Sequence, residues 1–426
     1  MAFEVDPFTS KLGRLPESEF EKARDTIRDH KLSKPVVLLI PVLYKSDGVE
    51  KKKGKIKLRD SLENIVDVLL GVDYLKQVTF GLDGAVTRAE LDTFEKLTRP
   101  VPNRRIIWNG SAGIKKVYAD MKKAGDNLIA GKGRNLYTML LDRYVKMNKS
   151  AVILHDSDIT SDSYGRRIDG ERCERIILSL AYPLVNPEIN FDYVKAYYDR
   201  IATDPEGNRF FTGRVNRLLV GPVIQALEKS TLGEDRAVRD YSTFLSAIKY
   251  ALAGEFGLSP ELANRIVIQP DWAIEIGILN YLYQSGYDIA QVDEEIYDHK
   301  HQKLSPDNPK KGLFKMGIDI SKSIFRELEA IGCSKILDPV HFATFLTLYR
   351  KIARDTVQKT HQISKYQGLK SKADDDSVCV DTFHEGLKIG HDVYLKKRHI
   401  LRGLPSPRNT RSEFRERIAD TVDRYN

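Results

Sequence analysis

Two aspartates, Asp156 and Asp158, directly follow a short apolar run at 151–154. Residues i and i+2 of an extended chain point to the same side, so the two carboxylates can face one point in a cleft. Oxygen ligands of this kind suit a hard divalent cation. The alternative is a polar turn after a strand, because Asp374 and Asp376 repeat the spacing in a stretch typical of an exposed acidic loop. The secondary structure expected around these residues is needed to distinguish a metal site from a turn.

The first 155 residues alternate strand and helix patterns. The apolar runs predict buried strands at 35–43, 77–82, 104–108 and 151–156, and the patterns between them predict helices at 58–71, at 87–97 and from 131 onward. Such alternation predicts an α/β fold with a parallel sheet covered by helices on both faces. Ligands bind beyond the carboxyl ends of strands in these sheets, which is where Asp83 and Asp156 fall.

Composition places the chain among ordinary globular proteins. Its 426 residues are enough for about two or three domains, and the apolar and charged fractions are average. We find no signal peptide and no apolar run of membrane-spanning length. The three scattered cysteines, Cys173, Cys333 and Cys379, argue against a disulfide framework or a zinc site and favour the cytoplasm. The net charge of +8 comes without a basic stripe, so no nucleic-acid partner is expected.

Beyond residue 158 the patterns change. The segment 159–320 is mixed, with a strand pattern at 191–201 and a helical pattern from Gly213. The segment 321–426 is mostly helical, interrupted at 368–377 and 402–410, and we interpret it as a helical appendage. A short helical segment, 1–34, is predicted before the first strand.

A Gly-Lys-Gly turn, residues 131–133, precedes a long predicted helix. Backbone N–H groups at such a turn, together with Lys132, can hold a phosphate group. A plain loop with one exposed lysine explains the turn equally simply. The chain contains no P-loop motif and no G-x-S-x-G motif.

Six fragments occur in the order in which one enzyme family has them: "LIPVLYKS", "AGKGRNLYTML", "HDSDI", "TGRVNRLLVGPVI", "LAGEFGLS" and "DWAIEIGILNYLYQSGYDIAQV". The chain thus resembles the glucosyl-3-phosphoglycerate synthases, which are retaining GT-A glycosyltransferases, over residues 35–305. The stretches "DSDITS" and "DWAIE" also resemble the related mannosylglycerate synthases. The resemblance implies a GT-A, Rossmann-like nucleotide-sugar-binding half at 35–158 and an acceptor-binding half at 159–320. It further implies a nucleotide-sugar donor, a divalent metal and a glycerate-type acceptor.

Where this chain matches the family's motifs, the family's functional residues can be assigned to residues of this chain. The resemblance implies donor binding by Pro41, Val42, Leu43, Asp83, Lys132, Asp156 and Ser157. It implies acceptor binding by Gly213, Arg214, Val215, Asn216, Gly254 and Glu255, with Arg214 on the acceptor's phosphate. Glu275 matches the acidic residue near the reacting centre and is the candidate catalytic residue. Lys45 stands where the family has an acid, which leaves the choice between UDP and GDP open.

The family's metal site adds a histidine to the two aspartates. Aligned without gaps from Glu275, that histidine falls on His301, with His299 as its neighbour. An exposed loop with two histidines is the alternative. The implied ligands are therefore Asp156, Asp158 and His301, for Mg²⁺ or Mn²⁺, and an imidazole ligand also lets Co²⁺ compete.

We therefore expect a cytoplasmic hexosyltransferase that moves glucose from UDP-glucose or GDP-glucose to the 2-hydroxyl of 3-phosphoglycerate, with retention. Two alternatives are a mannosylglycerate-type synthase using GDP-mannose and glycerate, and a sugar nucleotidyltransferase. A non-catalytic binding protein with the same fold is a third. A homodimer is left open.

Overall fold

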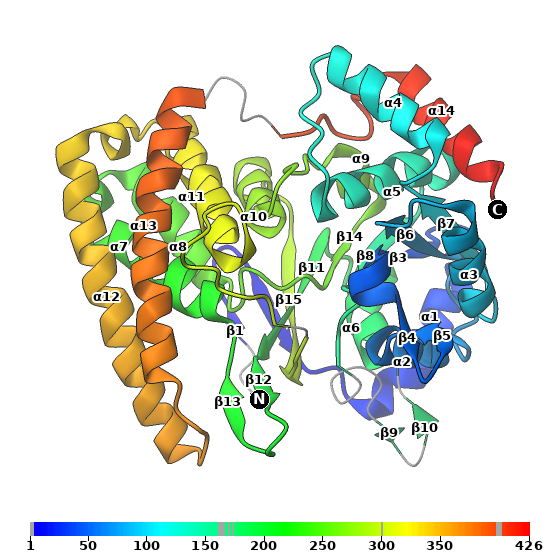
Figure 1. Ribbon diagram of the computed structural model, residues 1–426, viewed down its shortest axis with the longest axis horizontal. Helices are drawn as coiled ribbons and strands as arrows, with labels where there is room; N and C mark the ends of the chain where they lie inside the picture. The colour runs from blue at the N-terminus through cyan, green and yellow to red at the C-terminus, as the bar shows by residue number, and fades with distance from the viewer. Residues whose placement is uncertain (1–3, 161–166, 169–170, 173, 300, 398–402) are drawn as a thin grey trace.

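A nine-stranded mixed sheet runs through the centre of the computed structural model, which describes residues 4–160, 167–168, 171–172, 174–299, 301–397 and 403–426. The order of the strands is β1-β2-β15-β11-β14-β8-β3-β6-β7 (Figure 1). Cys173 lies outside the described residues. No helix in the described part of the chain combines the length and the apolar character needed to cross a bilayer.

The half of the sheet formed by residues 36–154 is parallel, as predicted. Its strands are β3 (Val36–Leu43), β6 (Gln77–Asp83), β7 (Arg104–Trp108) and β8 (Ala151–Leu154). Its helices are α2 (Asp60–Leu69), α3 (Arg88–Thr98), α4 (Ala112–Lys123) and α5 (Lys132–Met147). The predicted capping box at Thr87 and Glu90 starts α3.

Alternate residues of β3 enter two different hydrophobic cores. Val37 and Leu39 pack with α5 residues on one face, whereas Val36, Leu38 and Ile40 pack with α2 residues on the other. Since strand side chains alternate between faces, a continuous apolar run is what a sheet covered on both sides requires.

The other half of the sheet is mixed, which the strand-helix alternation did not predict. It contains β11 (Tyr193–Asp199), β14 (Phe256–Leu258) and β15 (Ile289–Ile296). β14 runs antiparallel between β8 and β11, while β11 and β15 are parallel. Strand β14 has only three residues, too short to give a recognisable pattern in the sequence.

The segment 1–34 is not purely helical, in contrast to the prediction. It forms β1 (Glu4–Val5) and β2 (Ser10–Gly13) before the single turn η1 (Glu17–Glu19) and helix α1 (Phe20–Asp29). β2 pairs in parallel with β15, so the start of the chain completes the far edge of the sheet.

Shorter elements surround the sheet. The hairpins are β4 (Val49–Lys52) with β5 (Lys55–Leu58), β9 (Arg167–Ile168) with β10 (Glu171–Arg172), and β12 (Ile201–Thr203) with β13 (Arg209–Phe211). The helices are α6 (Arg175–Val185), α7 (Gly221–Lys229), α8 (Arg236–Ala247), α9 (Pro260–Arg265) and α10 (Ile274–Ser285). The π-helical turns are η2 (Tyr44–Gly48) and η3 (Asn216–Val220), and the 3₁₀ turns are η4 (Thr231–Glu234) and η5 (Ser334–Leu337).

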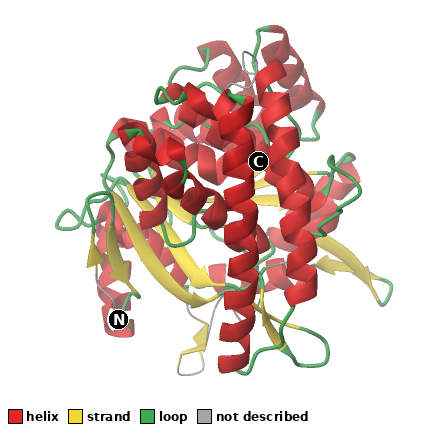
Figure 2. Cartoon of the chain, turned by 90° about the vertical axis from the view of Figure 1, so that its left-hand side faces the viewer, coloured by secondary structure: helices red, strands yellow, loops and turns green. Residues whose placement is uncertain are grey.

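The C-terminal helices divide between two places. α11 (Gly312–Ala330), α12 (Pro339–Tyr366) and α13 (Ala373–Lys397) form a layer on one side of the molecule, where α12 and α13 stand next to each other (Figures 1 and 2). α14 (Ser412–Asp423) lies on the other side against α4 and α5 (Figure 1), where Arg417 and Asp120 form a 2.8 Å ion pair. The region 321–426 is therefore not one separate appendage.

Candidate functional site

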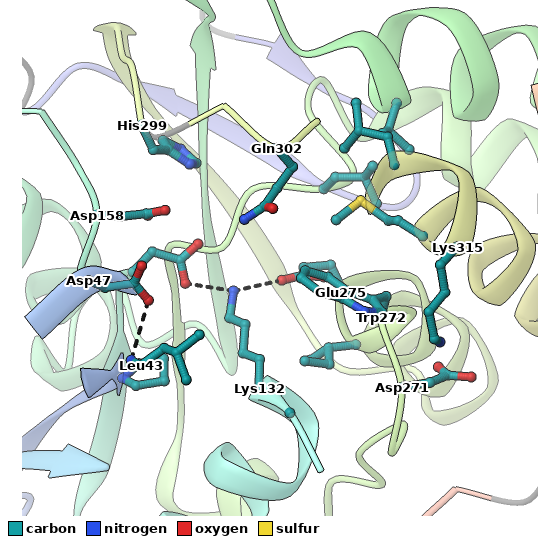
Figure 3. A pocket seen from close by; sticks show the side chains of 18 of the residues that line it. Leu43, Asp47, Lys132, Asp158, Asp271, Trp272, Glu275, His299, Gln302 and Lys315 are labelled. Carbon is teal, nitrogen blue, oxygen red and sulfur yellow. Dashed lines mark hydrogen bonds and ion pairs between the residues drawn. The ribbon is translucent and has the colours of Figure 1, made fainter. Parts of the chain in front are cut away.

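A cavity of about 370 Å³ opens beyond the carboxyl ends of the parallel strands β3, β6 and β8 (Figure 3). It brings together residues predicted from stretches up to 260 positions apart: Pro41, Val42, Leu43, Asp83, Lys132, Asp156, Ser157, Asp158, Gly213, Arg214, Val215, Asn216, Glu275 and His301. This is the position that the topology of a parallel sheet predicts.

One end of the cavity gathers the ligands for a cation, and we call it the metal end. Potential ligand atoms of Asp156, Asp158 and His299 all lie within 4.8 Å of one another. Two carboxylates and an imidazole suit Mg²⁺ or Mn²⁺. Figure 3 shows Asp158 and His299 facing the same space from different elements.

The histidine of this group is not the predicted one. An antiparallel bridge between Ile159 and His299 sets the register and brings buried His299 beside the aspartates. His301 lines the cavity but is outside the ligand group; its side chain is 40% exposed and its Nε2 lies 3.2 Å from the Asp298 carboxylate. An alignment without gaps cannot detect the pairing of two distant segments. This pairing favours His299 as the third metal ligand.

The carboxylates at the metal end are crowded and short of positive charge. Burial, followed by the Asp156 and Asp47 carboxylates, raises the pKa of Asp158 to about 8. Burial and then Asp156 raise the pKa of Glu255 to about 7. A divalent cation stabilises the ionised form of nearby acids, so these groups fit a metal ion.

Lys132 supplies the positive charge nearest to the carboxylates of this end. Its Nζ lies 2.6 Å from Asp156 Oδ1 and 3.1 Å from Glu275 Oε1 (Figure 3). Burial opposes the charge, but the two carboxylates outweigh it and raise the pKa of Lys132 above its ordinary value. Glu275 stands in the first turn of α10 and is held by this contact.

Two predicted acceptor-binding residues, Gly254 and Glu255, lie behind Asp156 and are absent from the cavity lining in the described residues. A Cβ atom at Gly254 would stand 2.6 Å from Asp156 Oδ2 and 3.0 Å from Lys132 Nζ, so a larger residue would displace these two side chains. The buried Glu255 accepts a 2.8 Å hydrogen bond from the Tyr198 hydroxyl. The structure therefore places both residues at the metal end, not with the acceptor residues as predicted.

Another part of the cavity lining is the 213–216 turn, and we call this part the acceptor end. Gly213 has a φ of 66°, and a Cβ atom there would meet the Tyr250 hydroxyl at 2.8 Å. Arg214 donates to the carbonyl oxygen of Gln302 at 3.0 Å and contacts the Cys379 thiol at 3.8 Å. No carboxylate of the described residues lies within 4 Å of its guanidinium. The charge of Arg214 is therefore available for an anion.

Several lining residues were missed by sequence reasoning. Asp47 belongs to the lysine-rich segment 44–57, whose composition is typical of a solvated surface loop, but the π-helical turn η2 positions it so that it accepts a 3.3 Å hydrogen bond from Leu43 N. Arg200, between β11 and β12, and Lys315, in α11, also line the cavity, with no motif around them. Among these residues only Asp47 had a sequence signal, which was its position as an acid a few residues after a buried strand.

A mixed sheet rich in parallel strands, with acidic metal ligands at the strand ends, is the GT-A glycosyltransferase fold. Glucosyl-3-phosphoglycerate synthase from Mycobacterium tuberculosis, solved with Mn²⁺, UDP and phosphoglyceric acid, shares this fold with a TM-score of 0.50. It is 17% identical, and the match covers 77% of this chain and 87% of that chain. The same enzyme solved with Mn²⁺, UDP-glucose and phosphoglyceric acid gives the same score.

Sequence comparison identifies the family. The chain is 31% identical to glucosyl-3-phosphoglycerate synthase of Persephonella marina over 367 residues, which is 85% of this chain and 82% of the relative. It is 30% identical to the enzyme of the same name from Methanococcoides burtonii, over 85% of this chain and 83% of the relative. No family model matches the chain. The chain belongs to the glucosyl-3-phosphoglycerate synthase family.

Proposed function

We propose that the protein transfers glucose from UDP-glucose to the 2-hydroxyl of 3-phosphoglycerate. The bond between the anomeric carbon and the diphosphate breaks, a bond to the acceptor oxygen forms, and the acceptor hydroxyl gives up its proton. The names of the relatives support the reaction. The single observation that carries it within this chain is a cavity that contains both a group of candidate metal ligands and an arginine with no carboxylate partner among the described residues.

The metal end suits the leaving diphosphate. Asp156, Asp158 and His299 would hold a divalent cation, which supplies Lewis-acid charge for the diphosphate when bound. Lys132 adds a fixed positive charge within the same space. Pro41, Val42, Leu43 and Asp83 line the part of the cavity next to strands β3 and β6, where we place the nucleoside.

The acceptor end suits the phosphate of 3-phosphoglycerate. A guanidinium binds phosphate with two charge-assisted hydrogen bonds, and Arg214 has no competing carboxylate in the described residues. Asn216 lines the same part of the cavity, and in the described part of the chain its buried Oδ1 makes no hydrogen bond. Binding at both ends presents the acceptor hydroxyl to the sugar without a search by diffusion.

We assign Glu275 an orienting role. Its carboxylate is engaged by Lys132, which fixes its direction at the cavity wall. Retention of the anomeric configuration stays a prediction from the family resemblance. The cytoplasm is the proposed compartment, because Cys333 and Cys379 are free thiols buried in the fold.

A donor and acceptor panel tests the proposal. UDP-glucose, GDP-glucose, UDP-mannose and GDP-mannose are each combined with 3-phosphoglycerate and with glycerate, in Mg²⁺ or Mn²⁺. We expect the highest kcat/KM with UDP-glucose and 3-phosphoglycerate. Preference for GDP-mannose with glycerate would overturn the proposal in favour of the mannosylglycerate-type reaction. Formation of UTP and glucose 1-phosphate from UDP-glucose when pyrophosphate replaces the acceptor would indicate a nucleotidyltransferase.

A further inference from the structure

The acidic stretch at 374–376 is not an exposed loop, as its composition suggested. It forms the first turn of α13, where carboxylates interact favourably with the helix dipole. Asp374 and Asp375 are exposed, but Asp376 is buried with 4% of its surface accessible. A buried carboxylate needs a partner, and the partner identifies what this turn does.

The partner of Asp376 is Arg217, which belongs to the turn that carries Arg214. Two hydrogen bonds, of 2.7 and 3.1 Å, join the guanidinium to the two carboxylate oxygens. Only 17% of the Arg217 side chain and 5% of the Asp376 side chain are exposed. Such a two-pronged pair fixes both the distance and the orientation of the arginine.

Further contacts from α12 and α13 hold the same turn. The buried Tyr349 hydroxyl donates to the carbonyl oxygen of Leu218 at 2.9 Å, and Arg217 Nη1 lies 3.4 Å from Thr360 Oγ1. On α13, Cys379 contacts the Arg214 guanidinium itself. The long helices α12 and α13, which stand together in Figure 2, therefore anchor residues 214–218 from one side.

We propose that Asp376 is a positioning residue for the acceptor phosphate, acting through Arg217 on the turn that presents Arg214. This inference rests on the proposed function, because it takes the Arg214 ligand to be the phosphate of 3-phosphoglycerate. It assigns the α12–α13 pair a role in acceptor affinity, which neither the sequence nor the names of the relatives indicate. Pairing with Asp376 also neutralises Arg217, whereas Arg214 has no carboxylate partner among the described residues.

The first test is steady-state kinetics of Asp376→Asn, with both substrates varied. The neutral amide cannot hold Arg217 as the carboxylate does, so the turn loosens and the KM for 3-phosphoglycerate should rise about 10-fold, since small misplacements of binding groups cost this much or more. The KM for UDP-glucose and the kinetics with glycerate should change less than about twofold. Asp376→Glu keeps the charge and should recover most of the affinity.

A matched control lies on the same helix. Asp381 pairs with Arg350 at 2.7 Å, but both side chains are about half exposed. Asp381→Asn should leave all kinetic constants near wild type, since exposed pairs contribute little. Equal losses in Asp376→Asn and Asp381→Asn would mean that α13 only supports the fold, and the inference would fail.

A double-variant cycle separates positioning from a general structural role. If Asp376 acts through Arg214, the Asp376→Asn change should cost almost nothing further with 3-phosphoglycerate in an Arg214→Ala background. Additive losses overturn the inference. If Asp376→Asn does not fold, Thr360→Val provides the test instead, because it removes the hydroxyl of a second side chain that contacts Arg217. A rise of about 2- to 3-fold in the KM for 3-phosphoglycerate would support the inference, and no change would refute it. Wild-type turnover in the same assay separates these outcomes from failure of the proposed function itself.

Discussion

The two ends of the cavity use charge in opposite ways. At the metal end, Asp156 is paired with the buried Lys132, and Asp158 and Glu255 have raised pKa values despite the positive charge nearby. At the acceptor end, Arg214 meets a carbonyl oxygen and a thiol, and the neighbouring Arg217 is already paired with Asp376. One end therefore lacks positive charge and the other lacks negative charge.

This difference explains how one cavity can order two anionic substrates. A nucleotide diphosphate brought with a divalent cation satisfies the metal end, and a phosphorylated acceptor satisfies the guanidinium. Exchange of the two substrates would place phosphate against carboxylates, which is unfavourable at short range. The following predictions test the comparison, from the largest expected effect to the smallest.

Asp158→Asn should have the largest effect, because it removes a charged metal ligand from the end that depends on the cation. Metal-bound charge is worth several kcal/mol at the diphosphate, so we expect kcat/KM to fall about 10²- to 10³-fold. The change is measured at saturating Mn²⁺ and Mg²⁺. Asp374→Asn, which alters an exposed acid of the other D-x-D stretch, is the control and should stay near wild type.

Arg214→Ala should act on the acceptor end alone. Hydrogen bonds to charged groups contribute roughly 1.5–3 kcal/mol, so kcat/KM for 3-phosphoglycerate should fall about 10- to 100-fold. Kinetics with both acceptors at fixed donor provide the measurement, and most of the loss should disappear with glycerate, which has no phosphate. Equal losses with both acceptors would show that Arg214 supports the donor or the fold, and the comparison of the two ends would break down.

His299→Ala should weaken metal binding by about 10-fold or more, whereas His301→Ala should change it little. His299 belongs to the ligand group and is buried, while His301 is outside that group. Activity titrated with Mn²⁺ gives the half-saturating concentration for each variant. A larger shift for His301→Ala would return the third ligand to the residue that the gapless alignment chose.

The histidine assignment also shows what the sequence could and could not predict. Strands β3, β6, β7 and β8 follow from apolar runs, and the helix at Thr87 follows from its capping box, because these signals are local. The two aspartates follow from their place at a strand end. Which of two histidines reaches them depends on the bridge between Ile159 and His299, a pairing across 140 positions that leaves no local signal.

Burial of charge was equally hard to foresee. Asp376 looked like part of an exposed acidic loop, but helix α13 turns it toward Arg217. Asp47 lies among lysines that suggested a solvated loop, but the turn η2 points it into the cavity. In both cases the composition of the segment was interpreted correctly. The direction of one side chain was not predicted, because it depends on tertiary packing.

Asp47→Asn should have the smallest effect of the four and shows whether the metal end depends on total charge or only on its ligands. Asp47 lines the cavity and its carboxylate contributes to the raised pKa of Asp158, but it is not among the three grouped ligands. Partly exposed charges interact by about 1 kcal/mol or less, so Mn²⁺ affinity measured by calorimetry should fall about 2- to 5-fold.

Raising the salt concentration to about 0.5 M should remove most of the difference, because screening weakens charge interactions beyond direct contact. Glu50→Gln removes an equal charge from β4 outside the cavity lining and should leave the affinity unchanged. A loss as large as that of Asp158→Asn, insensitive to salt, would make Asp47 a direct ligand, and unchanged affinity at low salt would mean that the metal end responds to its ligands alone.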